Sequence, residues 1–147
     1  MAALNKRASE IMIDVGVSTA TDITGFGLIG HLNEVLSASR CQARLNASRV
    51  PFFEEAVRLA ETGVVPGGTK ENRKSFEEVV EWSKDVAEVE RLLMNDAQTS
   101  GGLLIFVPEK NKDSLISALQ KENILAAHIG DVAEADKASV KRIFVSK

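Results

Sequence analysis

The sequence of 147 residues holds one cysteine, three prolines and no tyrosine, and it lacks any long apolar run. A membrane-spanning helix needs about 20 predominantly apolar residues in a row, and no stretch of the chain offers them. The N-terminal residues also lack the apolar centre of a signal peptide. A single thiol, Cys41, cannot form an internal disulfide, which fits a reducing compartment. The sequence therefore predicts a protein with no membrane partner and a cytoplasmic location.

An excess of positive charge is also missing. The chain carries 18 basic and 21 acidic residues, which gives a formal net charge of −3 at pH 7. Surfaces that bind nucleic acids are basic, so this balance argues against a nucleic-acid partner and leaves small anions such as nucleotides open. Apolar residues make up 44% and charged residues 27% of the chain, as is typical of a globular domain of this length.

A polar, glycine-rich stretch at residues 21–32 lies between two predicted helices. Apolar residues recur at helical spacing from Phe26 onward, so the polar residues lie at the N-terminus of the second helix. Free N–H groups at a helix N-terminus attract anions, and glycines let a phosphate approach the backbone closely. Asp22 adds a carboxylate oxygen, the type of ligand that Mg²⁺ prefers. The stretch therefore predicts a phosphate and Mg²⁺ site.

The same glycines also match another motif, the dinucleotide fingerprint G-x-G-x-x-G, at residues 25–30. That fingerprint requires a buried apolar strand before it and an acidic residue about 20 positions later. The preceding residues are Thr-Asp-Ile-Thr, and no carboxylate occurs between Glu34 and Glu54. A kinase glycine loop requires a β-hairpin where this sequence predicts a helix. A chance match is therefore the better interpretation.

The remaining pattern predicts an α+β fold with a mixed β-sheet covered by helices. We expect helices at residues 4–15, from 26 onward, and at 51–63, 76–82, 86–94 and 113–119. The helices near 76–82 and 86–94 each start with a capping-box pattern, Ser75 with Glu78 and Asp85 with Glu88. We expect extended segments at 18–23, 43–46, 103–107, 126–132 and 140–145, with a loop at 63–69 and a polar turn at 134–137. A second polar cluster at residues 95–102 leads directly into the strand at 103–107.

The two polar clusters together resemble one enzyme family. Residues 20–31 read Ala-Thr-Asp-Ile-Thr-Gly-Phe-Gly-Leu-Ile-Gly-His, and residues 96–104 read Asp-Ala-Gln-Thr-Ser-Gly-Gly-Leu-Leu. Both are similar to the C-terminal half of selenophosphate synthetase, also called selenide, water dikinase, and the resemblance covers nearly the whole chain, including residues 66–69 and Asn72. The Thr-Asp-x-Thr-Gly element is shared with the wider superfamily of aminoimidazole ribonucleotide synthetase, thiamine-monophosphate kinase and a hydrogenase maturation protein. The Gln-Thr-Ser-Gly-Gly-Leu-Leu element narrows the choice to the first family.

The resemblance implies an enzyme that makes selenophosphate, AMP and phosphate from ATP, selenide and water. It implies that residues 1–147 form a single C-terminal domain of a longer homodimeric enzyme, with most ATP and Mg²⁺ ligands on an N-terminal domain that this sequence does not contain. It also implies that Asp22 joins the Mg²⁺ site, with Thr24 and Gly25 shaping the phosphate pocket. The site residues implied in the second cluster are Thr99, Ser100 and Gly101, as a wall of the ATP site or of the domain interface. A tight turn that feeds the following strand explains them equally well.

Two departures from the family limit these roles. Ala97 stands where the family usually has proline, and the family's reactive cysteine or selenocysteine, its lysine and its other metal-binding aspartates are absent from this chain. Cys41 does not lie in the matching context, so no catalytic residue is assigned. We interpret His31 as structural, and Arg40, Arg44 and Arg49 as surface residues.

Other functions remain open from the sequence alone. Phosphoryl transfer needs several metal and cationic contacts, and this chain supplies one convincing ligand, so we expect the chain to be inactive alone. A free-standing module that binds a nucleotide or a partner without catalysis is one alternative. A domain of another ATP-dependent member of the superfamily is the other.

Overall fold

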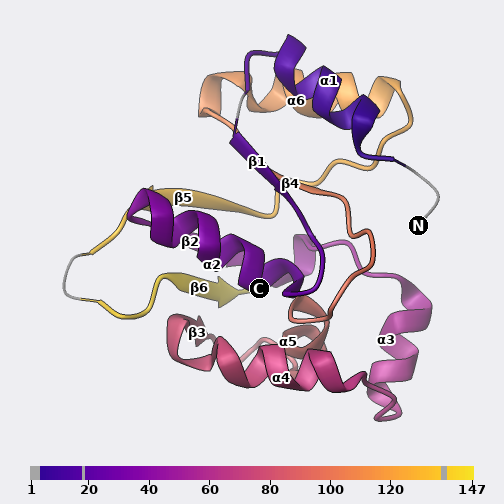
Figure 1. Ribbon diagram of the computed structural model, residues 1–147, viewed down its shortest axis with the longest axis vertical. Helices are drawn as coiled ribbons and strands as arrows, with labels where there is room; N and C mark the ends of the chain where they lie inside the picture. Colours follow the sequence, from indigo (N-terminus) through magenta and orange to yellow (C-terminus); the bar gives the residue numbers. More distant parts are fainter. Residues whose placement is uncertain (1–3, 18, 137–138) are drawn as a thin grey trace.

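The computed structural model describes residues 4–17, 19–136 and 139–147. The elements in chain order are α1 (Lys6–Asp14), β1 (Thr19–Asp22), α2 (Gly27–Ser39), β2 (Cys41–Asn46), the 3₁₀ turn η1 (Ala47–Arg49), α3 (Glu54–Glu61), α4 (Gly67–Ser75), the 3₁₀ turn η2 (Glu77–Val79), β3 (Val80–Trp82), α5 (Glu88–Met94), β4 (Leu103–Phe106), α6 (Glu109–Lys121), β5 (Gly130–Glu134) and β6 (Ile143–Ser146). Figure 1 shows α1 and α6 side by side at one end of the molecule and α3, α4 and α5 gathered at the other.

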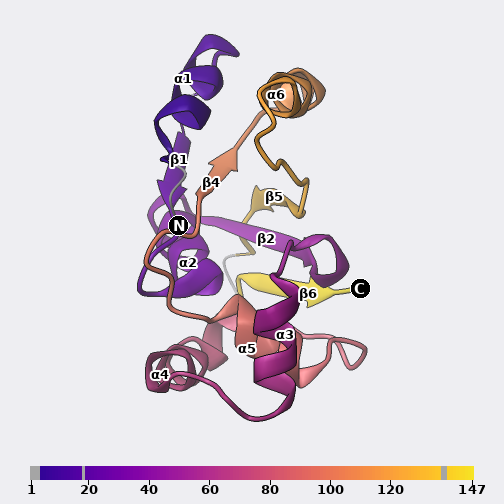
Figure 2. The ribbon, with the colours of Figure 1, turned by 90° about the vertical axis from the view of Figure 1, so that its right-hand side faces the viewer.

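The strands form two sheets. A four-stranded sheet has the order β3-β6-β2-β5, in which β2 is antiparallel to β5 and parallel to β6, and β6 is parallel to β3. The strands β1 and β4 form a separate antiparallel pair that leads from this sheet toward α1 and α6 (Figure 2). The predicted α+β fold with a mixed sheet covered by helices is confirmed, and its strands are divided between these two sheets.

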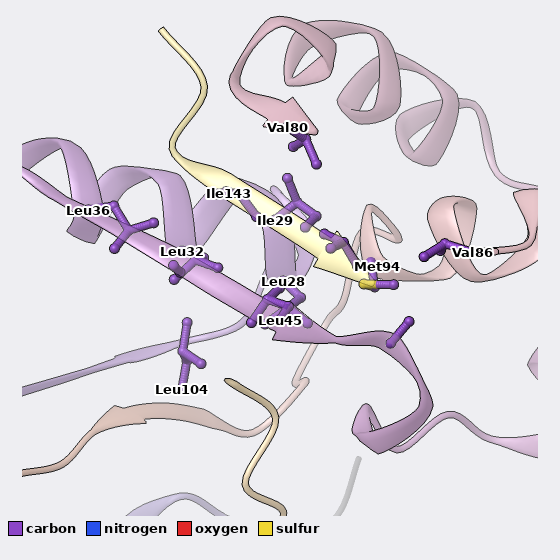
Figure 3. Packing of buried hydrophobic residues seen from close by; sticks show 13 residues of the cluster. Leu28, Ile29, Leu32, Leu36, Leu45, Val80, Val86, Met94, Leu104 and Ile143 are labelled. Carbon is purple, nitrogen blue, oxygen red and sulfur yellow. The ribbon is translucent and has the colours of Figure 1, made fainter. Parts of the chain in front are cut away.

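The main core lies between α2 and the four-stranded sheet. Apolar residues of α2 recur at helical spacing, so one face of the helix packs against β2 and β6 (Figure 3). The largest fully buried apolar side chains of this core are Ile29, Leu32, Leu36, Met94, Ile143 and Val145. Each such side chain contributes roughly 1.5–3 kcal/mol by leaving water, so this packing fixes where α2 begins.

A second core holds α1 against α6. Its buried residues are Ile11, Met12, Val17, Leu115 and Leu119. At the rim, Arg7 Nη2 donates a 2.8 Å hydrogen bond to Glu122 Oε1, and this bond lowers the pKa of the Glu122 carboxyl. The Asn111 side chain donates from Nδ2 to the Val15 carbonyl at 3.1 Å. The strands β1 and β4 connect this helical pair to the main core (Figure 2).

The predicted loop at 63–69 is confirmed for residues 63–66 only, and the predicted helix at 76–82 is wrong. The helix α4 starts inside that loop, with Pro66 at the N-cap, and it ends at Ser75, so the Ser75–Glu78 capping box does not form. Its only buried residue is Thr69, and a helix with so few apolar residues shows no apolar periodicity. Residues 77–82 instead form η2 and β3, because Val80 and Trp82 pair in parallel with β6.

Other element boundaries differ in smaller ways. The helix α3 begins at Glu54, since Phe53 is extended, so Pro51 is not at its first position. At the N-terminus of α5, the Glu90 carboxylate accepts a hydrogen bond from the Ala87 N–H at 2.7 Å. The predicted capping residue, Asp85, is therefore not the N-cap. The strand expected at 126–132 is β5, at Gly130–Glu134, and the last strand begins at Ile143. The extended segment at 18–23 is β1, apart from Ser18, which lies outside the described residues, as does Lys137 of the polar turn.

The tight packing around Gly30 provides a test of this fold. A Cβ at Gly30 would meet the Phe26 Cβ and would lie 2.7 Å from Phe76 Cε2. Alanine is about 1 kcal/mol better than glycine inside a helix, but overpacking costs about 1–3 kcal/mol, and contacts closer than 3.0 Å to both Phe26 and Phe76 place Gly30 in the upper part of that range. We expect Gly30→Ala to lower the free energy of unfolding by about 1–2 kcal/mol in urea denaturation. Gly67→Ala is the control, because nothing lies within 4 Å of its added Cβ. Equal stability of Gly30→Ala and the unchanged protein would contradict the packing.

Candidate functional site

The two polar clusters of the sequence lie side by side in the structure. We call residues 22–27 the first loop and residues 95–102 the second loop. The Ile23 N–H donates to the Gly102 carbonyl at 3.0 Å, and the Gly101 N–H donates to the Ile23 carbonyl at 2.9 Å. The Gln98 N–H donates to the Thr24 carbonyl at 3.0 Å. Backbone hydrogen bonds therefore join the two loops into one site.

The pairing of β1 with β4 brings the loops together. Asp22 is the last residue of β1, and its partner Leu103 is the first residue of β4. The chain therefore leaves the strand pair and returns to it at the same end. Ile23 packs against the main core, and side chains alternate along a strand, so Asp22, the last residue of β1, lies on the other face.

The Asp22 carboxylate is exposed at this end of the strand pair. Among the described residues it makes no hydrogen bond or ion pair. It is therefore free to bind a ligand.

Three glycines of the loops have different surroundings. Gly27 has φ +67°, and a Cβ there would lie 2.7 Å from the Asn95 carbonyl carbon. A Cβ at Gly101 would lie 2.9 Å from the Ile23 carbonyl oxygen. These two glycines are required for the close contact between the loops. Gly25 is exposed, and nothing lies within 4 Å of the position that a Cβ would take there, so among the three it leaves the backbone open to a ligand.

The helix α4 is hydrogen-bonded to both loops. Asn72 Nδ2 donates to the Gly25 carbonyl at 2.9 Å and to the Asn95 carbonyl at 3.0 Å. The Thr69 hydroxyl donates to Asp96 Oδ1. Positions three apart share one face of a helix, so Thr69 and Asn72 act together. The sequence placed Thr69 at the end of the loop at 63–69 and predicted no element for Asn72, so it missed the role of α4; the resemblance alone pointed to Asn72.

Asp96 and Gln98 shape the second loop from within. Gln98 Nε2 donates to Asp96 Oδ2 at 2.9 Å, so each oxygen of the Asp96 carboxylate accepts a hydrogen bond from a neighbouring side chain. Thr99 and Ser100 are exposed, and their hydroxyls make no hydrogen bond within the described part of the chain. The structure thus brings the predicted residues Asp22, Thr24, Gly25 and residues 99–101 to one end of the β1–β4 pair.

His31 lies beneath the first loop with little exposure. Its Nε2 is 3.1 Å from Thr24 Oγ1, and its Nδ1 is 3.0 Å from Glu34 Oε2. The Phe26 ring lies 5.7 Å from the imidazole, centroid to centroid. The side chain of His31 is thus held on both nitrogens, and it contacts a predicted site residue.

The other predicted residues lie elsewhere. Cys41 is half-buried on β2, where its thiol donates to the Ser39 carbonyl at 3.5 Å. The side chains of Arg40, Arg44 and Arg49 are exposed, and Arg44 stacks on the Phe144 ring at 5.3 Å. None of the helices within the described ranges is both long and apolar enough to cross a membrane.

The donors of the site fit only part of a metal centre. Residues 4–17, 19–136 and 139–147 contain no group of three or more His, Cys, Asp or Glu that could hold a metal ion. Mg²⁺ in phosphate sites is commonly held by one or two carboxylates together with water and phosphate oxygens. The free Asp22 carboxylate fits one ligand of such an ion, so the arrangement suits one wall of a shared metal and phosphate site.

Comparison with known proteins shows the family of the chain. The family described as AIR synthase related protein, C-terminal domain, matches residues 2–143. The chain belongs to this family. It is 43% identical over 143 residues to the selenide, water dikinase of Carboxydothermus hydrogenoformans. The aligned region covers 97% of this chain and 41% of that protein.

Other relatives of the chain carry the same name. It is 42% identical over 135 residues to the selenide, water dikinase of Pelobacter propionicus, covering 91% of this chain and 39% of that protein. It is 36% identical over 141 residues to that of Pseudomonas aeruginosa, covering 96% and 40%. The chain thus spans about two fifths of the length of these relatives. The resemblance inferred from the two polar clusters is confirmed.

The double hydrogen bond of Asn72 makes the site testable without a ligand. In Asn72→Asp, a carboxylate that cannot donate would face the carbonyls of Gly25 and Asn95. We expect a loss of about 2–3 kcal/mol in stability and faster amide hydrogen exchange in both loops. The control is Asn111→Asp, which breaks the bond to Val15 and should loosen only the contact of α1 with α6. Unchanged exchange in the loops of Asn72→Asp would contradict the role of α4.

Proposed function

We propose that this chain is the C-terminal part of a selenophosphate synthetase, a selenide, water dikinase. The whole enzyme makes selenophosphate, AMP and phosphate from ATP, selenide and water. The relatives named above and the free Asp22 carboxylate beside the second loop support this proposal. The single observation that carries it is the joining of the two loops whose sequences resemble that family.

In this proposal residues 1–147 form one domain, and the ATP and Mg²⁺ site is completed by an N-terminal domain. Mg²⁺ would spread the charge that develops on the reacting phosphate oxygens. Asp22 would bind the metal, and Thr24 with Gly25 would shape the phosphate pocket. Thr99, Ser100 and Gly101 would form a wall of the pocket. The complete enzyme would be a cytoplasmic homodimer.

A second candidate follows from how few metal ligands the chain holds. One free carboxylate at the site, with no cluster of three potential ligands among the residues described, would suffice to bind a metal nucleotide weakly but not to transfer its phosphoryl group. A module that binds a nucleotide or a partner without catalysis is therefore the alternative function.

Reconstitution of the enzyme tests the leading proposal. We expect this chain, mixed with the N-terminal part of the Carboxydothermus hydrogenoformans relative, to release AMP and phosphate only when selenide is present. Asp22→Asn should lower this turnover by about 100-fold at moderate Mg²⁺, because it removes an anionic metal ligand from an exposed strand end. The unfolding midpoint should not change.

The matched control is Asp113→Asn, on the exposed surface of α6. It removes the same charge at a distance from the strand end and should leave turnover unchanged. Full activity of Asp22→Asn at limiting Mg²⁺ would refute the metal role. Absence of turnover from a folded, associated mixture would count against the enzyme itself.

Titration calorimetry of ATP with Mg²⁺ distinguishes the two candidates. We expect no tight binding to this chain alone, since a lone carboxylate provides few of the contacts that a metal nucleotide needs. Tight binding that is lost in Asp22→Asn would favour the free-standing module. The Asp113→Asn variant again serves as the control for the change in net charge.

A further inference from the structure

A polar side chain of the first loop and two of α2 form a continuous hydrogen-bonded network. Thr24 Oγ1 lies 3.1 Å from His31 Nε2, and His31 Nδ1 lies 3.0 Å from Glu34 Oε2. His31 and Glu34 are three residues apart on α2, so they share one face of the helix. His31 is only 9% exposed, whereas Glu34 is open to solvent. This hydrogen-bonded network thus runs from solvent at Glu34, through the buried His31 ring, to the loop that also carries Asp22.

The direction of the hydrogen bonds follows from what each group can do. An ionised carboxylate only accepts, so the proton of the His31–Glu34 bond belongs to Nδ1. In a neutral imidazole the other nitrogen then has no proton and can only accept. The His31–Thr24 bond must therefore be made by the hydroxyl proton of Thr24. With that proton committed to His31, the Thr24 oxygen has no proton left to donate and offers only its lone pairs to a further partner.

The backbone around Thr24 holds this arrangement in place. The Thr24 carbonyl accepts from the Gly27 N–H at 3.0 Å and from the Gln98 N–H at 3.0 Å. The Phe26 ring packs against His31, and it also meets the Phe76 ring edge-on at 6.3 Å. The loop is therefore tied on both sides of the hydroxyl, so His31 decides how the hydroxyl points.

We propose that His31, oriented by Glu34, holds the Thr24 hydroxyl as a hydrogen-bond acceptor for a hydrated cation. His31 is then a positioning residue, and the ligand of Thr24 is a metal-bound water and not a phosphate oxygen. This inference rests on the proposed function for the presence of the cation. It deepens that function and refines the role of Thr24: the Thr24 hydroxyl would contact the hydrated cation at the edge of the phosphate pocket, so it would serve the same ligand as Asp22.

Charge and proton count separate the two kinds of ligand. A water molecule on Mg²⁺ donates strongly, and its proton complements the free lone pair of Thr24. An ionised phosphate oxygen only accepts, so it would face a lone pair with no proton between them. The Thr24 hydroxyl could donate to a phosphate oxygen only if His31 carried a proton on Nε2 and donated it to Thr24. The protonation of His31 therefore decides the chemistry of Thr24.

Nuclear magnetic resonance of this chain reads the tautomer directly. The sequence has two histidines, and long-range ¹H–¹⁵N correlation of a labelled sample separates them. At about pH 8, where an ordinary histidine is neutral, we expect His31 to carry its proton on Nδ1. His128 is an internal reference, because its Nε2 lies 3.1 Å from Asp131 Oδ1 and should carry the proton instead. The two rings should thus show opposite tautomers.

Two variants test the cause of the His31 tautomer. Glu34→Gln replaces a pure acceptor by a carboxamide that can also donate, so the Nε2-protonated form of His31 should rise severalfold. Thr24→Val removes the donor to Nε2 and should move only the His31 Nε2 resonance. His128 should not respond to either change. An Nε2-protonated or doubly protonated His31 in the unchanged chain, or a tautomer insensitive to Glu34→Gln, would overturn the proposal.

The ligand class is tested with two probes on the same samples. Hexaamminecobalt(III) imitates a hydrated magnesium ion and offers only N–H donors, whereas inorganic phosphate offers acceptors. We expect the cobalt complex to shift the amide resonances of Asp22 and Thr24. Its affinity should fall about five- to tenfold in Thr24→Val, as for loss of one hydrogen bond, and should be kept in Thr24→Ser.

The remaining outcomes separate this inference from the proposed function. A response of Thr24 to phosphate and not to the cobalt complex, or to neither probe, would overturn the cation assignment. Selenide-dependent turnover in the reconstituted enzyme is an independent measurement and would stand in either case. Conversely, opposite tautomers of His31 and His128 together with binding of the cobalt complex, but no turnover, would support the inference for His31 and contradict the proposed enzymatic function.

Discussion

The antiparallel pairing of β1 with β4 is the interaction on which the candidate site depends. The ladder continues beyond Asp22 and Leu103 through the backbone bonds of Ile23 with Gly101 and Gly102. Because one strand ends where the other begins, the loops on either side have to meet. Loss of this pairing would leave Asp22 at the end of a strand with no second loop beside it.

Close packing limits what the glycines of the site can do. A glycine-rich loop at a helix N-terminus suggests phosphate binding, but Gly27 and Gly101 have no space for a Cβ because the two loops press against each other. The amide of Asn72 then bonds both loops. The glycines therefore explain how the loops are joined, and the ligand chemistry rests mainly on the exposed Asp22, Gly25 and the hydroxyls.

The spacing of apolar residues in the sequence predicted those helices and strands that bury an apolar face in the core. The periodicity of α2 and the apolar run of β4 gave both elements nearly correctly. It failed for α4, which buries only Thr69, and for β3, whose form depends on pairing with β6. At the candidate site, the sequence singles out Asp22 by its residue type, and its role there stays a prediction. The bond of His31 to Thr24 could not be predicted, because a polar contact between a loop and a helix face leaves no periodic signal.

The two loops divide the polar chemistry of the site between them. The first loop offers two acceptors. One is the Asp22 carboxylate, and the other is the Thr24 oxygen when its hydroxyl proton is donated to His31. The second loop offers the exposed hydroxyls of Thr99 and Ser100, which can donate to anionic oxygens. A metal-bound phosphate needs acceptors on its hydrated cation and donors on its oxygens. In the proposed site, two loops of opposite hydrogen-bonding character, held together by one strand pair, would each meet part of that need, and the other metal ligands would come from the N-terminal domain.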